Sequence, residues 1–182
     1  MTEGVAMTEY AIFLRGVNVG GIILKMADLR AAVETLNVSR VTTLLASGNV
    51  TCTTDLAADE LKESVERLLR VTFGYDAWVV IIEAGRLREL VEACPFPADD
   101  PANHIYLTLC SDPTALADLV EASAGLEPGL TVLGPEAAAW WAPRGGTLES
   151  PLSKLTAKPR FKNSTTTRNL RTLQKVLAAF NA

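Results

Sequence analysis

The sequence predicts an α+β protein built from two halves, each of which combines a β-sheet with helices. Three observations support this fold class. In the first half, short apolar or β-branched runs alternate with amphipathic segments in the order β-α-β-β-α-β. A second cycle of strand, helix, strand and strand follows further along the chain. The stretch between the two cycles, residues 95–103, is rich in Pro and Asp and has the composition of a linker.

The first half comprises residues 8–94. Four runs of apolar or β-branched residues indicate its strands: 10–14, 41–46, 50–53 and 77–82. The last of these runs is apolar at every position, which is typical of a strand in the interior of a sheet. Between the second and third runs, Ser47, Gly48 and Asn49 suit the positive φ angles of a tight hairpin turn. The sequence Met1-Thr2-Glu3 recurs at residues 7–9, and residues 1–7 are expected to be a disordered extension.

Three helices complete this half. Apolar residues recur at helical spacing over 26–36, which predicts the first helix. The second helix is expected to begin after Thr54 or Asp55, either of which could be its N-cap, and to stop at Gly74. A third helix is expected over 86–93. The resulting order is that of the α/β-plait, or ferredoxin-like, unit.

The second half, residues 104–182, is predicted to be an irregular version of the same unit. Strands are expected at 105–110, 130–133 and 137–142, and a helix at 113–124. Residues 143–164 show no period and are expected to form a loop. A terminal amphipathic helix then carries its apolar side chains on one face: Leu170, Leu173, Leu177 and Phe180.

Composition narrows the function classes. No apolar run approaches the roughly 20 residues of a membrane helix, and the N-terminus lacks the pattern of a secretory signal. Three cysteines without CxxC spacing argue against a disulfide framework and favour the reducing cytoplasm. No cluster has the spacing of metal ligands, so we expect neither metal nor cofactor. The single histidine, His104, provides no catalytic set, and whether the protein is an enzyme stays open.

Charge is distributed unevenly along the chain. Residues 1–140 carry a formal net charge of −11, whereas residues 141–182 carry +7. A basic tail on an acidic body either docks within the molecule or holds an anionic ligand.

Four segments suit an anion, and each also has a structural explanation. The first is the glycine-rich loop at 14–21, with Arg15, Asn18, Gly20 and Gly21, whose backbone N–H groups could approach a phosphate closely. Lys25, at the start of the following helix, could add a positive charge over this loop. Alternatively, the glycines serve only a tight crossover of the chain. Ser47 and Asn49 are equally explained by a hairpin turn. Lys154, flanked by hydroxyls, is expected in the basic loop, where solvation would also explain it.

The fourth segment, residues 165–169, is predicted to begin the last helix, with a threonine as its N-cap. Arg168 and Arg171 would then oppose the helix dipole unless an anion, or a carboxylate of the acidic body, lay nearby. Thr167 and Asn169 belong to the same segment.

Taken together, five motifs resemble the bacterial family catalogued as domain of unknown function 1697, from about Thr8 to the C-terminus: FLRGVNVGG at 13–21, SGNV at 47–50, CPFP at 94–97, SKL at 153–155 and TTRN at 166–169. The resemblance implies a pair of α/β-plait-like halves and brings no established activity. Two positions depart from the family's pattern. Leu170 stands where a tryptophan is typical, and Cys94 stands where asparagine is common.

The function expected from these motifs is the binding of an anionic, phosphate-bearing small ligand in a cleft between the halves. The residues expected to line it are Arg15, Asn18, Gly20, Gly21, Lys25, Ser47, Asn49, Lys154, Thr167, Arg168 and Asn169. Two alternatives remain: a non-enzymatic scaffold or homodimer, and an RNA-binding α/β-plait module, which the acidic body disfavours.

Overall fold

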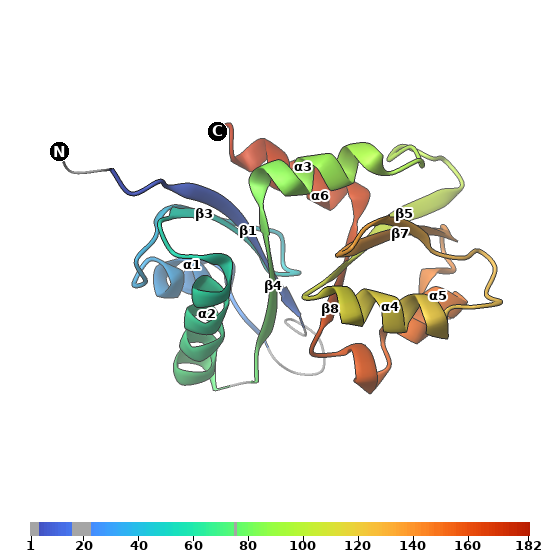
Figure 1. Cartoon of the computed structure of the whole chain (residues 1–182), viewed down its shortest axis with the longest axis horizontal. Coiled ribbons are helices and arrows are strands. Elements are labelled where there is room, and N and C mark those ends of the chain that lie inside the picture. The colour runs from blue at the N-terminus through green and yellow to red at the C-terminus, as the bar shows by residue number, and fades with distance from the viewer. Residues whose placement is uncertain (1–3, 16–22, 75) are drawn as a thin grey trace. The chain divides into compact units, whose positions relative to one another are not determined.

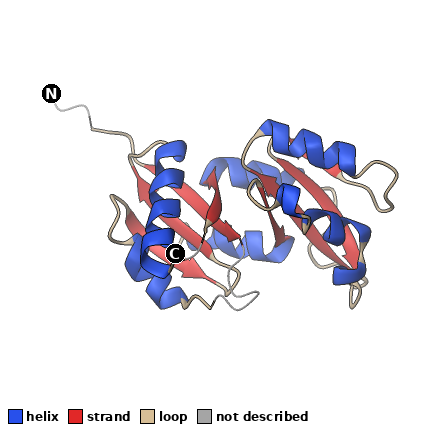
Figure 2. Cartoon of the chain, turned by 90° about the horizontal axis from the view of Figure 1, so that it is seen from below, coloured by secondary structure: helices blue, strands red, loops and turns tan. Residues whose placement is uncertain are grey.

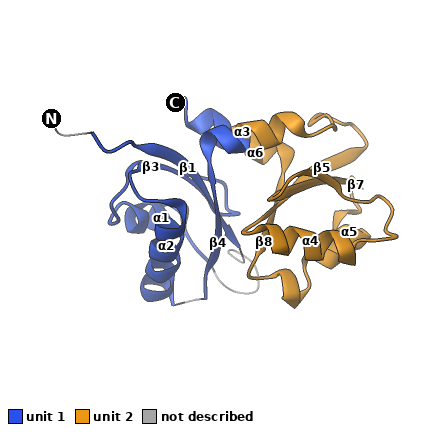
Figure 3. Cartoon of the chain, in the orientation of Figure 1, with its two compact units in different colours: residues 1–87, 176–182 blue, residues 88–175 orange. Residues whose placement is uncertain are grey.

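The computed structural model describes residues 4–15, 23–74 and 76–182, and it divides into two compact units (Figure 3). Unit 1 comprises Met1–Leu87 and Val176–Ala182, and unit 2 comprises Arg88–Lys175. The division therefore falls within two helices, α3 (Ala84–Ala93) and α6 (Leu170–Ala179). The predicted linker, residues 95–103, lies in unit 2.

Unit 1 follows the predicted order of elements (Figure 1): β1 (Thr8–Arg15), α1 (Met26–Val33), β2 (Ser39–Leu44), β3 (Asn49–Thr54), α2 (Ala58–Phe73) and β4 (Trp78–Glu83). Its four strands form an antiparallel sheet in the order β2-β3-β1-β4, with the apolar runs of β1 and β4 side by side. This is the strand order of the α/β-plait, so the predicted fold class is confirmed for this unit.

One face of the unit 1 sheet packs against α1 and α2. Alternate residues of β1, among them Tyr10, Ile12 and Leu14, join Leu29 of α1 and Leu61 of α2 in one buried cluster. Gly74 ends α2 in the left-handed conformation, as predicted, with φ of 69°. The start of α2 differs from the prediction. Ala57 occupies the N-cap position in place of Thr54 or Asp55, and its N–H donates a hydrogen bond to the Glu60 carboxylate.

Unit 2 repeats the topology of unit 1: β5 (Asn103–Cys110), α4 (Pro113–Ala122), β6 (Thr131–Gly134), β7 (Ala137–Pro143), α5 (Pro151–Thr156) and β8 (Thr165–Asn169). Its sheet has the order β6-β7-β5-β8. As in unit 1, the second, third, first and fourth strands of the unit therefore lie side by side in that order. The helices and strands of both units are distinguished in Figure 2. Trp140 of β7 packs with Leu119 of α4 and Leu152 of α5 in a buried cluster.

Two predictions about unit 2 are wrong. The expected loop at 143–164 contains α5, which starts where the Ser150 hydroxyl accepts the Ser153 N–H and Pro151 occupies the first helical position. The segment 165–169 is the strand β8 and not the start of a helix, because its backbone pairs with β5, Leu107 lying opposite Arg168. Three consecutive β-branched threonines favour this extended conformation.

Within the described residues, no helix combines the length and the apolar character needed to cross a lipid bilayer.

Candidate functional site

The predicted ligand residues of unit 1 that the structure describes gather at one end of its sheet. Gly48 has a φ of 82°, and its carbonyl accepts a hydrogen bond from the Leu14 N–H at 2.9 Å, so the turn lies beside the end of β1 and next to Arg15. The Thr43 hydroxyl, near the end of β2, donates to the Met26 carbonyl at 3.3 Å, which brings the start of α1 to the same end. Lys25 immediately precedes Met26 and is exposed.

The chemistry of these residues differs. The Asn49 side chain is fully buried and donates to the Leu44 carbonyl at 2.9 Å and to the Ser47 hydroxyl at 3.0 Å, so its amide helps to form the turn. Arg15 is half-buried, and burial lowers the pKa of its guanidinium from the ordinary value. Asn18, Gly20 and Gly21 lie outside the described residues.

In unit 2, adjacent residues of β8 face opposite sides of the sheet. The Thr167 hydroxyl pairs with the Thr108 hydroxyl at 2.8 Å, and the Trp140 indole N–H donates to Thr108 at 2.9 Å, so Thr167 belongs to a buried network on the helix-covered face. Arg168 projects from the opposite face and is only 7% exposed. Its Nη1 donates to the Thr166 hydroxyl at 2.6 Å and to the Thr167 carbonyl at 3.1 Å.

The strand β8 leads directly into α6. The Asn169 side-chain oxygen accepts a hydrogen bond from the Arg171 N–H at 2.9 Å, so asparagine caps this helix instead of the predicted threonine. The Arg171 Nε in turn donates to the Ala98 carbonyl at 2.9 Å. The first turn of α6 contains no acidic residue.

Lys154 lies on α5 and not in the predicted loop. It is exposed and forms an ion pair with Glu149, with 3.5 Å between Nζ and the carboxylate oxygen. Such a pair at the surface is weak, because water and salt screen both charges.

The three cysteines are free thiols, and none is placed as a reactive nucleophile. Cys52 and Cys110 are buried in strands, and burial raises their thiol pKa values to about 11 and about 12. Cys94 is half-buried, and burial raises its thiol pKa as well. A thiol with a raised pKa stays protonated at neutral pH and is a poor nucleophile. His104 is the second residue of β5, and the described residues contain no group of three or more potential metal-binding side chains.

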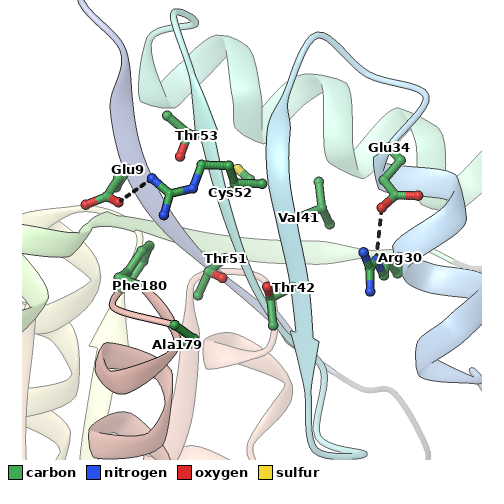
Figure 4. A pocket seen from close by; sticks show the side chains of 12 residues that line it. Glu9, Arg30, Glu34, Val41, Thr42, Thr51, Cys52, Thr53, Ala179 and Phe180 are labelled. Carbon is green, nitrogen blue, oxygen red and sulfur yellow. Dashed lines mark hydrogen bonds and ion pairs between the residues drawn. The ribbon is translucent and has the colours of Figure 1, made fainter.

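The structure also contains a polar groove in unit 1 that the sequence analysis did not single out (Figure 4). Its volume is about 330 Å³. Its floor consists of threonines on neighbouring strands, with Thr42 opposite Thr51 and Thr53 opposite Glu9 in the sheet register. Arg40 and Phe180 contribute to its walls.

The sequence did contain a signal for this groove. In β3, Val50 and Cys52 alternate with Thr51 and Thr53, and this period of two predicts one apolar and one polar face. Threonine is also a favoured strand residue, so the pattern indicated the strand without indicating a site.

Comparisons with known proteins identify the chain's relatives. A structure described as that of "conserved bacterial protein SP0830 from Streptococcus pneumoniae" matches with a TM-score of 0.79 and 22% sequence identity, covering 96% of this chain and 99% of the other. This likeness supports the two-sheet fold. A comparison with curated proteins gives no match. The model of a family described as a protein of unknown function, DUF1697, matches residues 7–131. The match spans more than half of the chain, and the chain therefore belongs to the DUF1697 family.

Proposed function

We propose that this protein binds an anionic, phosphate-bearing small molecule, and that the segment from Thr165 to Arg171 supplies part of the site. The observation that supports this proposal is a concentration of positive charge where β8 passes into α6. Arg168 carries its guanidinium on a nearly buried strand position, and Arg171 follows in the first turn of the helix.

Helix electrostatics add to this charge. The N-terminus of a helix carries a partial positive charge, which an acidic residue usually offsets in the first turn. The first turn of α6 has Arg171 instead, and this arrangement costs free energy until an anion lies nearby. A phosphate group would gain charge-assisted hydrogen bonds from guanidinium and backbone donors at once.

The side chain of Arg168 is also oriented. One of its terminal nitrogens is fixed by Thr166 and by the backbone of β8, so the planar guanidinium has a defined direction before any ligand binds. An oriented fork recognises phosphate better than a mobile one, because less side-chain entropy is lost on binding.

The RNA-binding alternative has less support. Sheets of this topology that bind RNA stack bases on exposed aromatic side chains. In β1, the residues on the face opposite the helices include Ala11 and Phe13, and both are fully buried.

A thermal-shift titration tests the proposal with inorganic phosphate, pyrophosphate, AMP and glucose 6-phosphate. We expect at least one of them to raise the Tm, because a ligand at a hundred times its Kd stabilises the folded state by about 2.7 kcal/mol. Arg168→Lys keeps the charge but loses the fork and should weaken binding about tenfold, as should Arg171→Gln. Lys175→Ala, which removes an exposed charge from the same helix, serves as the control.

Two results would contradict the proposal. One is the absence of a Tm increase with all four anions. The other is an increase of the same size in wild type, in Arg168→Lys and in Arg171→Gln, since such an increase would come from unspecific ionic stabilisation.

A further inference from the structure

The groove of unit 1 contains a buried hydroxyl group whose hydrogen-bonding capacity the protein does not use. Thr51 is only 2% exposed, and its side chain lines the groove because its neighbours, Val50 and Cys52, face the helix-covered core. Within the described part of the chain, no hydrogen bond involves the Thr51 hydroxyl. Buried hydroxyls are normally hydrogen-bonded, so this one is explained by a partner that enters the groove.

The neighbouring side chains offer two more hydroxyls, one on half-buried Thr53 and one on exposed Thr42. Thr42 and Thr53 lie beside Thr51 on the floor, and no side-chain hydrogen bond of either hydroxyl is found among the described residues. Figure 4 shows the three threonines lining the groove from adjacent strands. Each hydroxyl can both donate and accept, so a row of three matches a ligand that presents several hydroxyls itself.

Arg40 overhangs the groove from a strained position. Its φ is 53°, in the left-handed region that an arginine rarely adopts, and it lies where the register of β2 against β3 shifts. Its guanidinium lies 3.8 Å from the Glu9 carboxylate, and the side chains of Arg40 and Glu9 are 64% and 41% exposed. Strained backbone of this kind is concentrated at functional sites.

Positive and negative side chains around the groove are equal in number. Arg40 faces Glu9, and Arg30 pairs with Glu34 at 2.9 Å, so two cations accompany two carboxylates. A phosphate dianion would gain little from such an environment, whereas a neutral ligand would meet strong donors and strong acceptors together. Phe180 adds an apolar ring at the wall, against which the carbon face of a sugar can pack.

We propose that this groove binds a neutral, polyhydroxylated small molecule of monosaccharide size, a sugar or a polyol. The Thr51, Thr42 and Thr53 hydroxyls would bind the ligand's hydroxyl groups from below, and the Arg40–Glu9 pair would bind them from the rim. The volume of about 330 Å³ lies at the lower end of the range for small-molecule sites. The site is independent of the anion site proposed above, since its residues belong to a different unit.

Saturation-transfer NMR and calorimetry with D-glucose, D-galactose and myo-inositol test this proposal. We expect at least one of these probes to bind wild type, and Thr51→Val to weaken that binding about tenfold, because one hydrogen bond is lost at constant side-chain volume. Arg40→Gly should also weaken binding, and glycine accepts the left-handed conformation without strain. Thr72→Val, at an exposed position of α2, is the matched control and should bind as wild type does.

The proposal is overturned if none of the three probes binds to folded wild-type protein. It is also overturned if both Thr51→Val and Arg40→Gly bind a probe with the wild-type Kd. Circular dichroism establishes that each variant is folded. Either negative outcome leaves the anion proposal untouched, because that proposal is tested through Arg168→Lys and Arg171→Gln, which lie in unit 2.

Discussion

Two buried threonines should respond oppositely to the same substitution, and this contrast probes the polar chemistry of both sheets. Thr108 is fully buried and holds two partners, the Trp140 indole N–H at 2.9 Å and the Thr167 hydroxyl at 2.8 Å. Thr108→Val keeps the shape and leaves both partners unsatisfied. Each stranded buried group costs about 1–3 kcal/mol, so the two together predict a loss of about 2–6 kcal/mol in the free energy of unfolding.

Thr51→Val should have the opposite sign. The Thr51 hydroxyl has no hydrogen-bond partner among the described residues, so its replacement by a methyl group removes a buried polar atom without stranding another. The expected gain is about 1 kcal/mol. The protein would then be more stable and would bind its ligand less well, a trade-off that is common at binding sites.

Urea denaturation of wild type and the two variants, followed by tryptophan fluorescence and circular dichroism, measures these differences. The double variant Thr108→Val with Trp140→Phe is the control, because removing the indole N–H should reduce the effect of the Thr108 substitution. Equal destabilisation by Thr108→Val and Thr51→Val would refute the reasoning, and so would a Thr108→Val variant as stable as wild type.

Three further predictions concern a helix end, the thiols and a carboxylate. Gly74→Ala should lower the free energy of unfolding by about 1 kcal/mol, measured in urea, because the φ of 69° is strained for alanine although its Cβ meets no atom within 4 Å. In native protein at neutral pH, iodoacetamide should label Cys94 slowly and Cys52 and Cys110 more slowly still, because burial raises all three thiol pKa values. Mass spectrometry measures the labelling rates, and rapid labelling of Cys52 would contradict this prediction. The pKa of Asp100, measured by NMR, should lie below the ordinary value of 3.8, because two backbone N–H groups donate to its carboxylate; its contribution to stability is then present above pH 3.8 and is lost as the pH falls through the lowered pKa.

The sequence predicted most of the fold, because several elements follow from local patterns alone. The apolar run at 77–82 predicts the strand β4, although β4 lies at the edge of its sheet and not in the interior that such a run indicates. Gly74 ends α2 and Gly48 lies in the turn before β3, and in both cases a positive φ makes glycine the favoured residue.

The two elements that were wrongly predicted, α5 and β8, lie in the last forty residues, where local signals are short. The helix α5 has only six residues, and its apolar face consists of Leu152 and Leu155, too few to define a period. For β8, the sequence Thr-Thr-Thr-Arg-Asn suits a helix cap as well as a strand, and pairing with β5, about sixty residues earlier in the chain, decides between them. Long-range pairing of this kind is not visible in a local pattern.

The candidate sites were predictable to different degrees. Arg168 stands out in the sequence as a cation next to a helix start, and in the structure it lies two residues before α6, although it belongs to the strand β8. The groove could not be found in this way, because it depends on the backbone of Arg40, on the register that sets Thr42 opposite Thr51, and on Phe180 far along the chain.

The most direct test of the proposed anion site is an NMR titration of the wild-type protein with pyrophosphate, followed through its backbone amide signals. Binding at the junction of β8 and α6 predicts saturable shifts that are largest between Thr165 and Arg171 and that shrink in Arg168→Lys. Shifts that are absent, or that are largest outside this segment and unchanged in Arg168→Lys, would contradict it.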